Sequence, residues 1–223
     1  MAEAAPVITI DGPSGSGKGT VSALVAEALG WHILDSGALY RLAGHAVSKS
    51  GLDFNNPAQA AEIARKLSVR FEGGKVVLAG EDVTLAIRTE EAGNNASKVA
   101  AMPQVRAALL DWQREAARPP GLVADGRDMG TTVFPDAPLK VFLTASAEER
   151  AQRRYKQLKE KGITSNIADL AADIRERDER DRTRSASPLV PAEGAMAIDS
   201  TSLTIDEVVE KILQAARERG LLS

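Results

Sequence analysis

The sequence predicts an α/β protein built on a parallel sheet of five strands flanked by helices. Five short apolar stretches alternate along the chain with segments of helical periodicity, which is the order that right-handed βαβ crossovers produce. A glycine-rich turn that contains a lysine follows the first stretch directly and leads into the first helix. With 223 residues, of which 43% are hydrophobic, the chain is long enough for one large core with a smaller insertion.

The elements of this fold can be placed from the apolar pattern. Strands are expected at 7–11, 32–36, 121–126, 139–145 and 195–200. Helices are expected at 18–29, 37–50, 57–67, 103–117, 146–161, 166–185 and 204–219. Ser146 and Thr204 are the expected N-caps of their helices, because glutamates follow each of them within the first turn.

Residues 69–83, VRFEGGKVVLAGEDV, do not fit the alternation of strands and helices. They predict short antiparallel strands joined by a turn at Gly73–Gly74, with a second turn near Gly80. We therefore expect a small antiparallel β element inside an inserted subdomain that spans about 55–100.

The composition excludes several functional classes. The chain has no cysteine, which rules out disulfides and thiolate chemistry, and its two histidines, His32 and His45, are too few for a histidine-rich metal site. The net charge of −3 does not favour nucleic acid as a partner. No apolar run is long enough for a membrane span, and the N-terminal residues lack the pattern of a signal peptide. We expect a cytoplasmic protein without a metal site of its own.

The glycine-rich turn has the spacing of a phosphate-binding loop. In VITIDGPSGSGKGT (7–20), Gly12, Gly17 and Lys18 match the pattern G-x-x-x-x-G-K. Glycines allow positive φ angles and let backbone N–H groups turn inward, and the positive end of the following helix faces the same place. Lys18 would supply a mobile positive charge for the outer phosphates.

Two other interpretations of this turn fit the sequence less well. The dinucleotide pattern G-x-G-x-x-G fails, because Thr20 stands where the last glycine belongs. A glycine-rich turn without a ligand is the second alternative, and the flanking strand and helix disfavour it. Gly19 separates Lys18 from the hydroxyl of Thr20, and in this the sequence GKGT resembles the loops of nucleoside monophosphate kinases and some of their relatives.

Polar side chains follow several of the predicted strands where they end. Because ligands bind at the carboxyl ends of parallel strands, these side chains are candidates for a site beside the phosphate loop. They are Asp11 after the first strand, Asp35, Ser36, Tyr40 and Arg41 after the second, and Asp125, Arg127 and Asp128 after the third.

Two charged helical segments add further candidates. Asp173, Arg177, Asp181 and Arg184 lie on one face of the helix that ends in DIRERDERDRTR, although ion pairs on a solvated face are the alternative explanation. Arg150, Arg153 and Arg154 share a face of the preceding helix. Gly162 predicts a turn between the two helices, a shape suited to a lid over a polyphosphate.

Taken in order, the motifs resemble those of bacterial cytidylate kinases over essentially the whole chain, including the inserted β element. The motifs are ITIDGPSGSGKGT, LDSGALYR, IRTEE, ADGRDMGTTVFPDA, RDERDRTR, SPLVPA and DSTSLTIDEVV. The resemblance implies transfer of the γ-phosphoryl group of ATP to CMP or dCMP, with a hydrated, nucleotide-bound Mg²⁺. It implies a single kinase domain over 1–223, with an acceptor-binding region at about 37–100 and a lid at about 153–166. We expect the protein to be a monomer.

The resemblance also implies which residues contact each part of the substrates. Nine consecutive loop residues would hold ATP: Gly12, Pro13, Ser14, Gly15, Ser16, Gly17, Lys18, Gly19 and Thr20. The acceptor would contact Ser36, Arg106, Asp128 and Arg184 with its cytosine, Ser97, Arg177 and Asp181 with its sugar, and Arg41 and Arg127 with its phosphate. Asp125 would lie near the hydrated metal, and Arg153 and Arg154 would close over the phosphates beside Lys18.

Two rival functions share some of these features. A kinase of another small acceptor, such as shikimate or dephospho-coenzyme A, has the same loop and fold class but needs neither the β element nor the charged face of RDERDRTR. A nucleotide-dependent switch or binding module would bind ATP without transferring phosphate to any monophosphate.

Overall fold

The computed structural model describes residues 5–72, 75–160 and 162–222 and divides the chain into two compact units. The first unit comprises the chain up to Leu34 together with the chain from Ala116 onward, and the second is Asp35–Glu115. Each unit has its own hydrophobic core.

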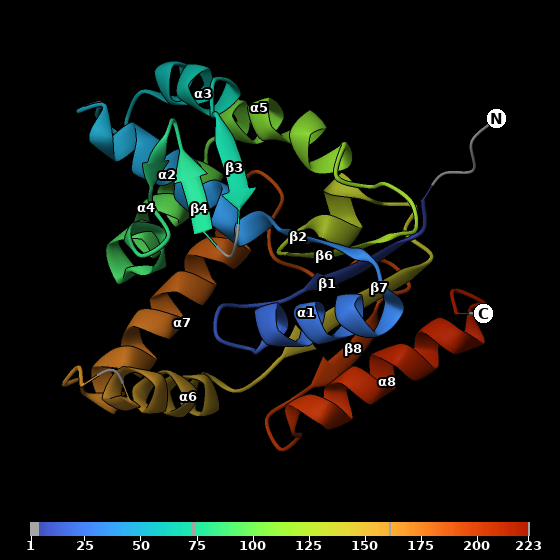
Figure 1. The fold of residues 1–223 in the computed structure, drawn as a ribbon. Coiled ribbons are helices and arrows are strands. Elements are labelled where there is room, and N and C mark those ends of the chain that lie inside the picture. The colour runs from blue at the N-terminus through green and yellow to red at the C-terminus, as the bar shows by residue number, and fades with distance from the viewer. Residues whose placement is uncertain (1–4, 73–74, 161, 223) are drawn as a thin grey trace. The chain divides into compact units, whose positions relative to one another are not determined.

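The first unit is built on the predicted five-stranded sheet, with strand order β2-β6-β1-β7-β8 (Figure 1). The strands are β1 (Val7–Asp11), β2 (His32–Asp35), β6 (Leu122–Gly126), β7 (Leu139–Thr144) and β8 (Met196–Asp199). Central strand β1 pairs in parallel with both neighbours, so that Ile8 lies opposite Val123 on one side and Leu139 on the other. Strands β7 and β8 are also parallel. Because β1 is buried along its whole length, its carboxyl end is held rigidly where the phosphate loop begins.

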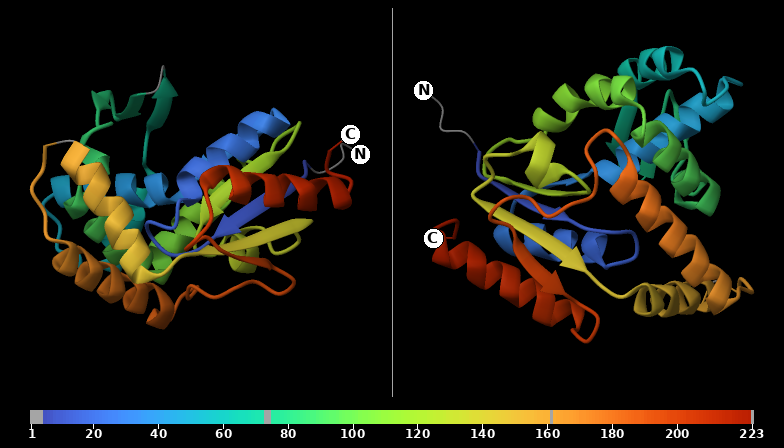
Figure 2. Two further views of the ribbon diagram at one scale, coloured as in Figure 1. Left: turned by 90° about the horizontal axis from the view of Figure 1, so that it is seen from below. Right: turned by 180° about the vertical axis from the view of Figure 1, so that it is seen from behind.

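Helices α1 (Lys18–Leu29) and α8 (Ile205–Glu218) lie side by side against this sheet, as Figures 1 and 2 show. Their apolar residues, among them Val25 and Ile212, pack with Ile10 and Val141 of the strands to form the core. Thr204 and Glu207 cap α8 reciprocally, which confirms the predicted N-cap. Among the described residues, no helix is both long enough and apolar enough to cross a membrane.

A second pair of helices in this unit, α6 (Ala147–Glu160) and α7 (Ile167–Thr183), lies together in sequence and in space (Figure 2). The Oγ of Ser146 accepts a hydrogen bond from the backbone N–H of Glu149 at 3.1 Å, as its predicted capping role requires. Gly162 has a φ of +72°, the left-handed conformation expected of a residue in a turn. A short π-helical turn, η2 (Met129–Val133), follows β6.

The second unit combines four helices with a small antiparallel sheet. The helices are α2 (Ser36–Lys49), α3 (Pro57–Arg65), α4 (Glu90–Ala100) and α5 (Pro103–Arg114). The sheet consists of β3 (Val69–Glu72), β4 (Lys75–Leu78) and β5 (Glu81–Asp82), and the 3₁₀ turn η1 (Ala86–Arg88) follows it. This sheet confirms the predicted antiparallel element, and Gly80 forms its second turn with a φ of +89°. The predicted turn at Gly73–Gly74 lies outside the described residues.

Helix α4 is an element that the apolar pattern did not predict. Thr89 begins it, because its Oγ1 accepts a hydrogen bond from the N–H of Ala92 at 3.1 Å, and Glu90 and Glu91 occupy the first turn. Its buried face is made largely of small residues such as Ala96, which give a weak hydrophobic signal. Helix α4 carries Ser97, one of the residues expected to contact the acceptor.

Candidate active site

The phosphate loop joins β1 to α1 and needs glycine at two positions for different reasons. A Cβ on Gly12 would lie 1.9 Å from the carbonyl oxygen of Leu143, so only glycine can pass this close to β7. Gly17, with a φ of +91°, lies at the N-cap position of α1. The loop therefore presents the positive end of α1 and its unpaired N–H groups on one side, the arrangement that binds phosphate.

Lys18 is almost completely buried at the start of α1, and its Nζ donates a hydrogen bond to the carbonyl oxygen of Pro13 at 2.8 Å. The ammonium is thus held across the loop rather than extended into solvent. Burial, together with the smaller effect of the positive charge of Arg127, lowers the pKa of Lys18 from 10.5 to about 7, and the charges of Asp125 and Asp11 oppose this shift. A bound phosphate would restore the positive form, because it would place negative charge beside the ammonium.

Asp11 ends β1 and is 3% exposed. Its carboxylate accepts hydrogen bonds from the backbone N–H groups of Met129 and Gly130, each at 2.8 Å, and thereby fixes the turn η2 to the end of β1. Burial raises the pKa of Asp11 to about 7 despite these two bonds, which favour the charged form. Asp11 holds the structure around the loop together, and both of its oxygens are in use.

Three further charged residues stand at the end of β6. Asp125 and Asp128 are buried, and Arg127 is partly exposed. The charge of Asp125 raises the pKa of Lys18 and the charge of Arg127 lowers it, which places the end of β6 beside the phosphate loop. The Nε of Arg127 also forms an ion pair with the Oδ2 of Asp181 at 3.2 Å, and this contact joins the end of β6 to α7.

The charged face of α7 is not simply a solvated face. Asp181 is buried, and the charge of Arg177 contributes to the lowered pKa of Lys18. Arg184, just beyond the end of α7, donates from Nε to the carbonyl oxygen of Ser187 at 2.7 Å. The structure therefore brings Arg177, Asp181 and Lys18 into one charged region of the first unit.

The three arginines of α6 differ in their surroundings. Arg153 donates from Nη2 to the carbonyl oxygen of Ser200 at 2.7 Å, with a longer contact of 3.5 Å from Nη1 to that of Ser16 in the loop. Arg154 has a contact of 3.5 Å with the side chain of Gln157. Arg150, which the helical pattern grouped with them as part of a basic lid, is 4% exposed and forms a buried ion pair with Asp178. It therefore has no free positive charge to offer a phosphate.

The second unit carries the other residues expected to contact the acceptor. Arg41 on α2 donates from Nη1 to the carbonyl oxygen of Ile87 at 2.8 Å, and Ser36 is buried at the start of the same helix. Arg106 on α5 lies over the ring of Tyr40, with 5.4 Å from its guanidinium carbon to the ring centroid. Ser97 is partly buried on α4. Asp35, a candidate from the end of the second strand, accepts from the N–H of Ala38 and caps α2.

The side-chain oxygens beside the phosphate loop determine whether the protein alone could hold Mg²⁺. Within 5–72, 75–160 and 162–222, no three carboxylate or histidine side chains gather into a site that could hold a metal. Asp125 nevertheless lies close to the start of α1, because a Cβ on Gly19 would be 3.7 Å from its Oδ2, and the exposed Thr20 follows. One carboxylate and one hydroxyl fit a hydrated ion carried by a nucleotide better than an ion held by protein alone.

Ser200, at the end of β8, is a residue near the loop that the sequence interpretation did not assign. It is buried, and its Oγ lies 3.4 Å from the carbonyl oxygen of Ser16 and 3.0 Å from that of Thr144. The sequence signal for this residue is its position at the end of the strand predicted at 195–200, where the polar residues of a parallel sheet reach the edge that binds ligands.

Comparison with known proteins agrees with this geometry. The family model described as cytidylate kinase matches residues 8–218. A cytidylate kinase from Colwellia psychrerythraea is 59% identical over 97% of this chain and 98% of its own length. A second, from a Marinomonas species, is 59% identical with both chains covered completely. An uncharacterized protein from Eubacterium ventriosum has a TM-score of 0.50 at 11% identity, over 95% of this chain and 98% of that one, a likeness of fold alone.

Both comparisons by sequence extend across the phosphate loop, the inserted sheet and the charged helix α7. The matched range therefore includes the phosphate loop, the inserted sheet and α7, and not the loop alone. With a phosphate loop on the central strand and a family match over nearly its full length, the chain belongs to the cytidylate kinase family.

Proposed function

We propose that this protein transfers the γ-phosphoryl group of ATP to CMP or dCMP, giving ADP and CDP or dCDP. The observation that carries the proposal is the match to the cytidylate kinase family over residues 8–218, which includes the phosphate loop. Because the acceptor is already a phosphate oxyanion, the reaction needs alignment and charge neutralisation more than a strong base.

For the donor, we assign the loop from Gly12 to Thr20 to the phosphates of ATP. The glycine conformations and the position of Lys18 at the start of α1 support this assignment, since backbone N–H groups and an ammonium would face the same anion. Arg153 and Arg154 are assigned to the phosphates in the closed state, as part of a lid at about 153–166. Their closure would exclude water and limit hydrolysis of ATP.

For the acceptor, we assign its phosphate to Arg41 and Arg127. The sugar is assigned to Ser97, Arg177 and Asp181, and the base to Ser36, Arg106, Asp128 and Arg184. The region at about 37–100, with the inserted sheet, would belong to acceptor binding within a single kinase domain over 1–223. Support comes from the charges and hydroxyls of these residues, which suit an anion, a ribose and a cytosine respectively.

We also assign a hydrated Mg²⁺ to the nucleotide, with Asp125 and Thr20 as the protein oxygens that would face its waters. The ion would neutralise phosphate charge when bound. The nearness of the Asp125 carboxylate to Gly19 supports this placement. The protein's own contribution is to orient the phosphates with loop N–H groups and to balance their charge with Lys18 and Arg127.

We infer further that the protein acts as a monomer in the cytoplasm and binds neither nucleic acid nor membranes. The cytoplasm is supported by the proposed substrates, since ATP and nucleoside monophosphates are pools of the cell interior. The net charge of −3 does not favour polyanionic partners.

An assay that couples ADP formation to NADH oxidation tests the function, with ATP and Mg²⁺ and a panel of acceptors. The panel contains CMP, dCMP, UMP, AMP, GMP, shikimate and dephospho-coenzyme A. We expect turnover with CMP and dCMP well above that with every other acceptor. Preferred turnover with shikimate or dephospho-coenzyme A, or ATP binding without transfer to any monophosphate, would replace the proposal with one of its rivals.

A further inference from the structure

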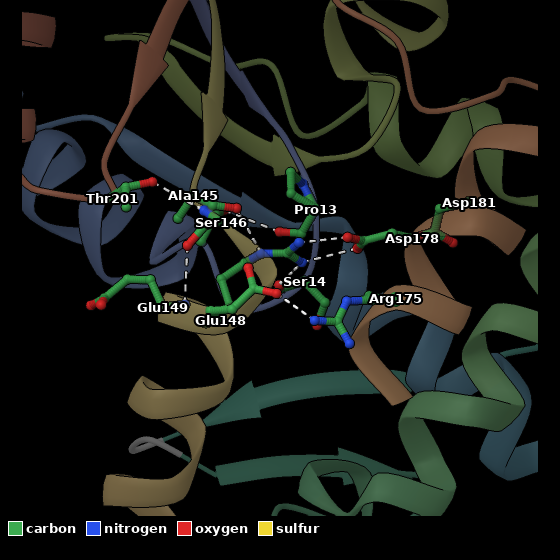
Figure 3. A network of polar contacts seen from close by, with 12 residues as sticks. Pro13, Ser14, Ala145, Ser146, Glu148, Glu149, Arg175, Asp178, Asp181 and Thr201 are labelled. Atoms are coloured by element: carbon green, nitrogen blue, oxygen red, sulfur yellow. Dashed lines mark hydrogen bonds and ion pairs between the residues drawn. The ribbon is translucent and has the colours of Figure 1, made fainter. Parts of the chain in front are cut away.

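Arg150 makes contacts that join the phosphate loop to both helices of the α6–α7 pair. Figure 3 labels its partners Ser14, Ala145 and Asp178. Its guanidinium pairs with the Asp178 carboxylate through two hydrogen bonds, at 2.9 Å from Nη1 and 2.5 Å from Nη2. Its Nε donates to the carbonyl oxygen of Ala145 at the end of β7, at 2.9 Å. Nη1 also donates to the carbonyl oxygen of Ser14 in the loop, at 3.0 Å.

Stability alone does not explain why the Arg150–Asp178 ion pair is buried. Arg150 is 4% exposed and Asp178 is 8% exposed, so both charges have lost most of their hydration. A buried pair of this kind is often no more stabilising than an apolar pair of the same volume, because the cost of desolvation offsets the attraction. The additional contacts of Arg150 with two backbone carbonyls suggest that its geometry serves the loop.

The contact with Ser14 constrains the orientation of a loop peptide. The carbonyl of Ser14 and the N–H of Gly15 belong to one planar, trans peptide unit, so they point in opposite directions. A carbonyl fixed toward Arg150 therefore directs the N–H of Gly15 away from the guanidinium, which leaves this N–H to donate to the phosphate that the proposed function assigns to the loop. A Cβ on Gly15 would lie 3.4 Å from the Cβ of Arg150, which shows that the side chain packs directly against the loop.

We propose that Arg150, aligned by Asp178, is a positioning residue that fixes the Ser14–Gly15 peptide for ATP binding and couples the loop to α6 and α7. The proposal rests on the assignment of the loop to ATP. Arg150 does not contact the phosphates in this account. Its guanidinium orients a backbone N–H, and the bidentate pair prevents the side chain from leaving the loop.

A double-mutant cycle separates this role from a purely structural one. Arg150→Met alone leaves the buried Asp178 carboxylate without its partner and is expected to lower the melting temperature. Adding Asp178→Leu removes that charge and is expected to restore most of the melting temperature. ATP binding should not recover, because the double variant still lacks the donor to Ser14. We expect its affinity for a non-hydrolysable ATP analogue, measured by calorimetry, to be about tenfold weaker or more, a typical loss for a misaligned binding group.

The matched control is Glu148→Ala with Arg175→Ala. These residues form an exposed ion pair between the same two helices (Figure 3). In the described part of the chain, neither side chain forms a hydrogen bond or ion pair with the loop. We expect this control to retain ATP affinity and melting temperature. Recovery of wild-type ATP affinity in the Arg150→Met, Asp178→Leu variant would overturn the proposal, because affinity would then follow stability alone.

Arg150→Lys keeps the test decisive if the double variant does not fold. A single ammonium can pair with Asp178 but cannot also reproduce the planar set of contacts to Ser14 and Ala145. Weaker binding of the ATP analogue, with the KM for CMP within about twofold of wild type, is expected from a change confined to the loop. Unchanged affinity for the analogue would contradict the proposal.

The outcome is distinguishable from failure of the proposed kinase activity. Binding of the analogue is measured without an acceptor, so the effect of Arg150 on the loop is read directly. Turnover with CMP is measured on the wild-type protein in parallel. Loss of analogue affinity in the variants together with no wild-type turnover would support the positioning role and reject CMP as the acceptor.

Discussion

At the scale of single residues, Lys18 is the group on which donor binding depends most strongly. Its ammonium is buried and donates a hydrogen bond across the loop to Pro13, and the charges of Asp125 and Arg127 shift its pKa in opposite directions. We expect Lys18→Ala to lower kcat/KM by more than about a hundredfold, since loss of such a transition-state contact costs about 3 kcal/mol. Thermal unfolding should show that the variant is folded, because the Oγ of Ser16 still donates to the carbonyl oxygen of Pro13 at 3.0 Å after the ammonium is removed.

Lys211→Ala is the control for this substitution. Lys211 is exposed on α8, away from the loop, and its removal should leave kcat and both KM values unchanged. A Lys18→Ala variant that retained more than about a tenth of wild-type activity would count against the assignment of this lysine to the phosphates.

The lowered pKa of Lys18 predicts a proton linkage. In the free protein Lys18 loses its proton near pH 7, whereas phosphate charge would raise its pKa in the complex. Between these two pKa values the complex holds a proton that the free protein lacks, so binding takes up a proton and ATP affinity falls as the pH rises above 7. Calorimetry of the ATP analogue in buffers of different ionisation enthalpy measures this uptake, and Lys18→Ala should lack it. Equal enthalpies in all buffers at pH 8 would contradict the linkage.

Single residues differ in how well the sequence predicts their surroundings. The loop glycines and Lys18 were predictable because the spacing of the motif reflects backbone geometry. The pairing of Arg150 with Asp178 was not, since the partners lie on separate helices and helical spacing shows only which residues share a face. Asp11 and Asp35 also appeared as candidate site residues, although their oxygens bind backbone N–H groups.

At the scale of elements, the small antiparallel sheet is linked to a residue assigned to the acceptor. Val76 of β4 and Val83 pack with Ile87 of η1 and with Leu42 of α2. The carbonyl oxygen of Ile87 in turn accepts a hydrogen bond from Arg41. Replacement of residues 69–83 by a short Gly-Ser linker should therefore disturb Arg41 and raise the KM for CMP.

The same replacement should leave ATP binding nearly intact, because the phosphate loop belongs to the other unit. The measurements are the KM for CMP and the calorimetric affinity for the ATP analogue, with circular dichroism as the check on folding. An equal loss of both affinities would mean that the sheet supports the whole protein and is not specific to the acceptor.

Helices were predictable where the apolar periodicity and the N-cap residues indicated the same bounds. The observed ends of α1, α6, α7 and α8 lie close to the predicted ones, and both predicted caps are present. Helix α4 was missed because small residues form its buried face, and η2 was missed because a π-helical turn has no short sequence signature. In both cases packing against the rest of the unit supplies what the local sequence does not.

At the scale of the whole molecule, the assigned residues are distributed over two units of the chain. The inner strands β1 and β6 of the five-stranded sheet were predictable because buried parallel strands form continuous apolar runs. The acceptor residues were not predictable from spacing, since Ser97 and Arg106 lie on helices with no motif of their own. Their assignment depends on the resemblance to the family, and the comparisons support that resemblance over the whole chain.

The assignment of Asp128 to the base implies that the protein selects cytosine over uracil. The two bases differ at the 4-position, where cytosine has an amino donor and uracil has a carbonyl acceptor. The buried carboxylate of Asp128 is assigned to that amino group, and it would face the uracil O4 as acceptor against acceptor. Unpaired buried polar groups of this kind discriminate strongly between two ligands.

The ratio of kcat/KM for CMP to kcat/KM for UMP tests this most directly, measured in the wild type, in Asp128→Ala and in the exposed control Asp136→Ala. We predict that the wild type and Asp136→Ala strongly favour CMP, and that Asp128→Ala loses far more activity with CMP than with UMP. Equal use of both acceptors by the wild type, or a ratio that Asp128→Ala leaves unchanged, would contradict the account.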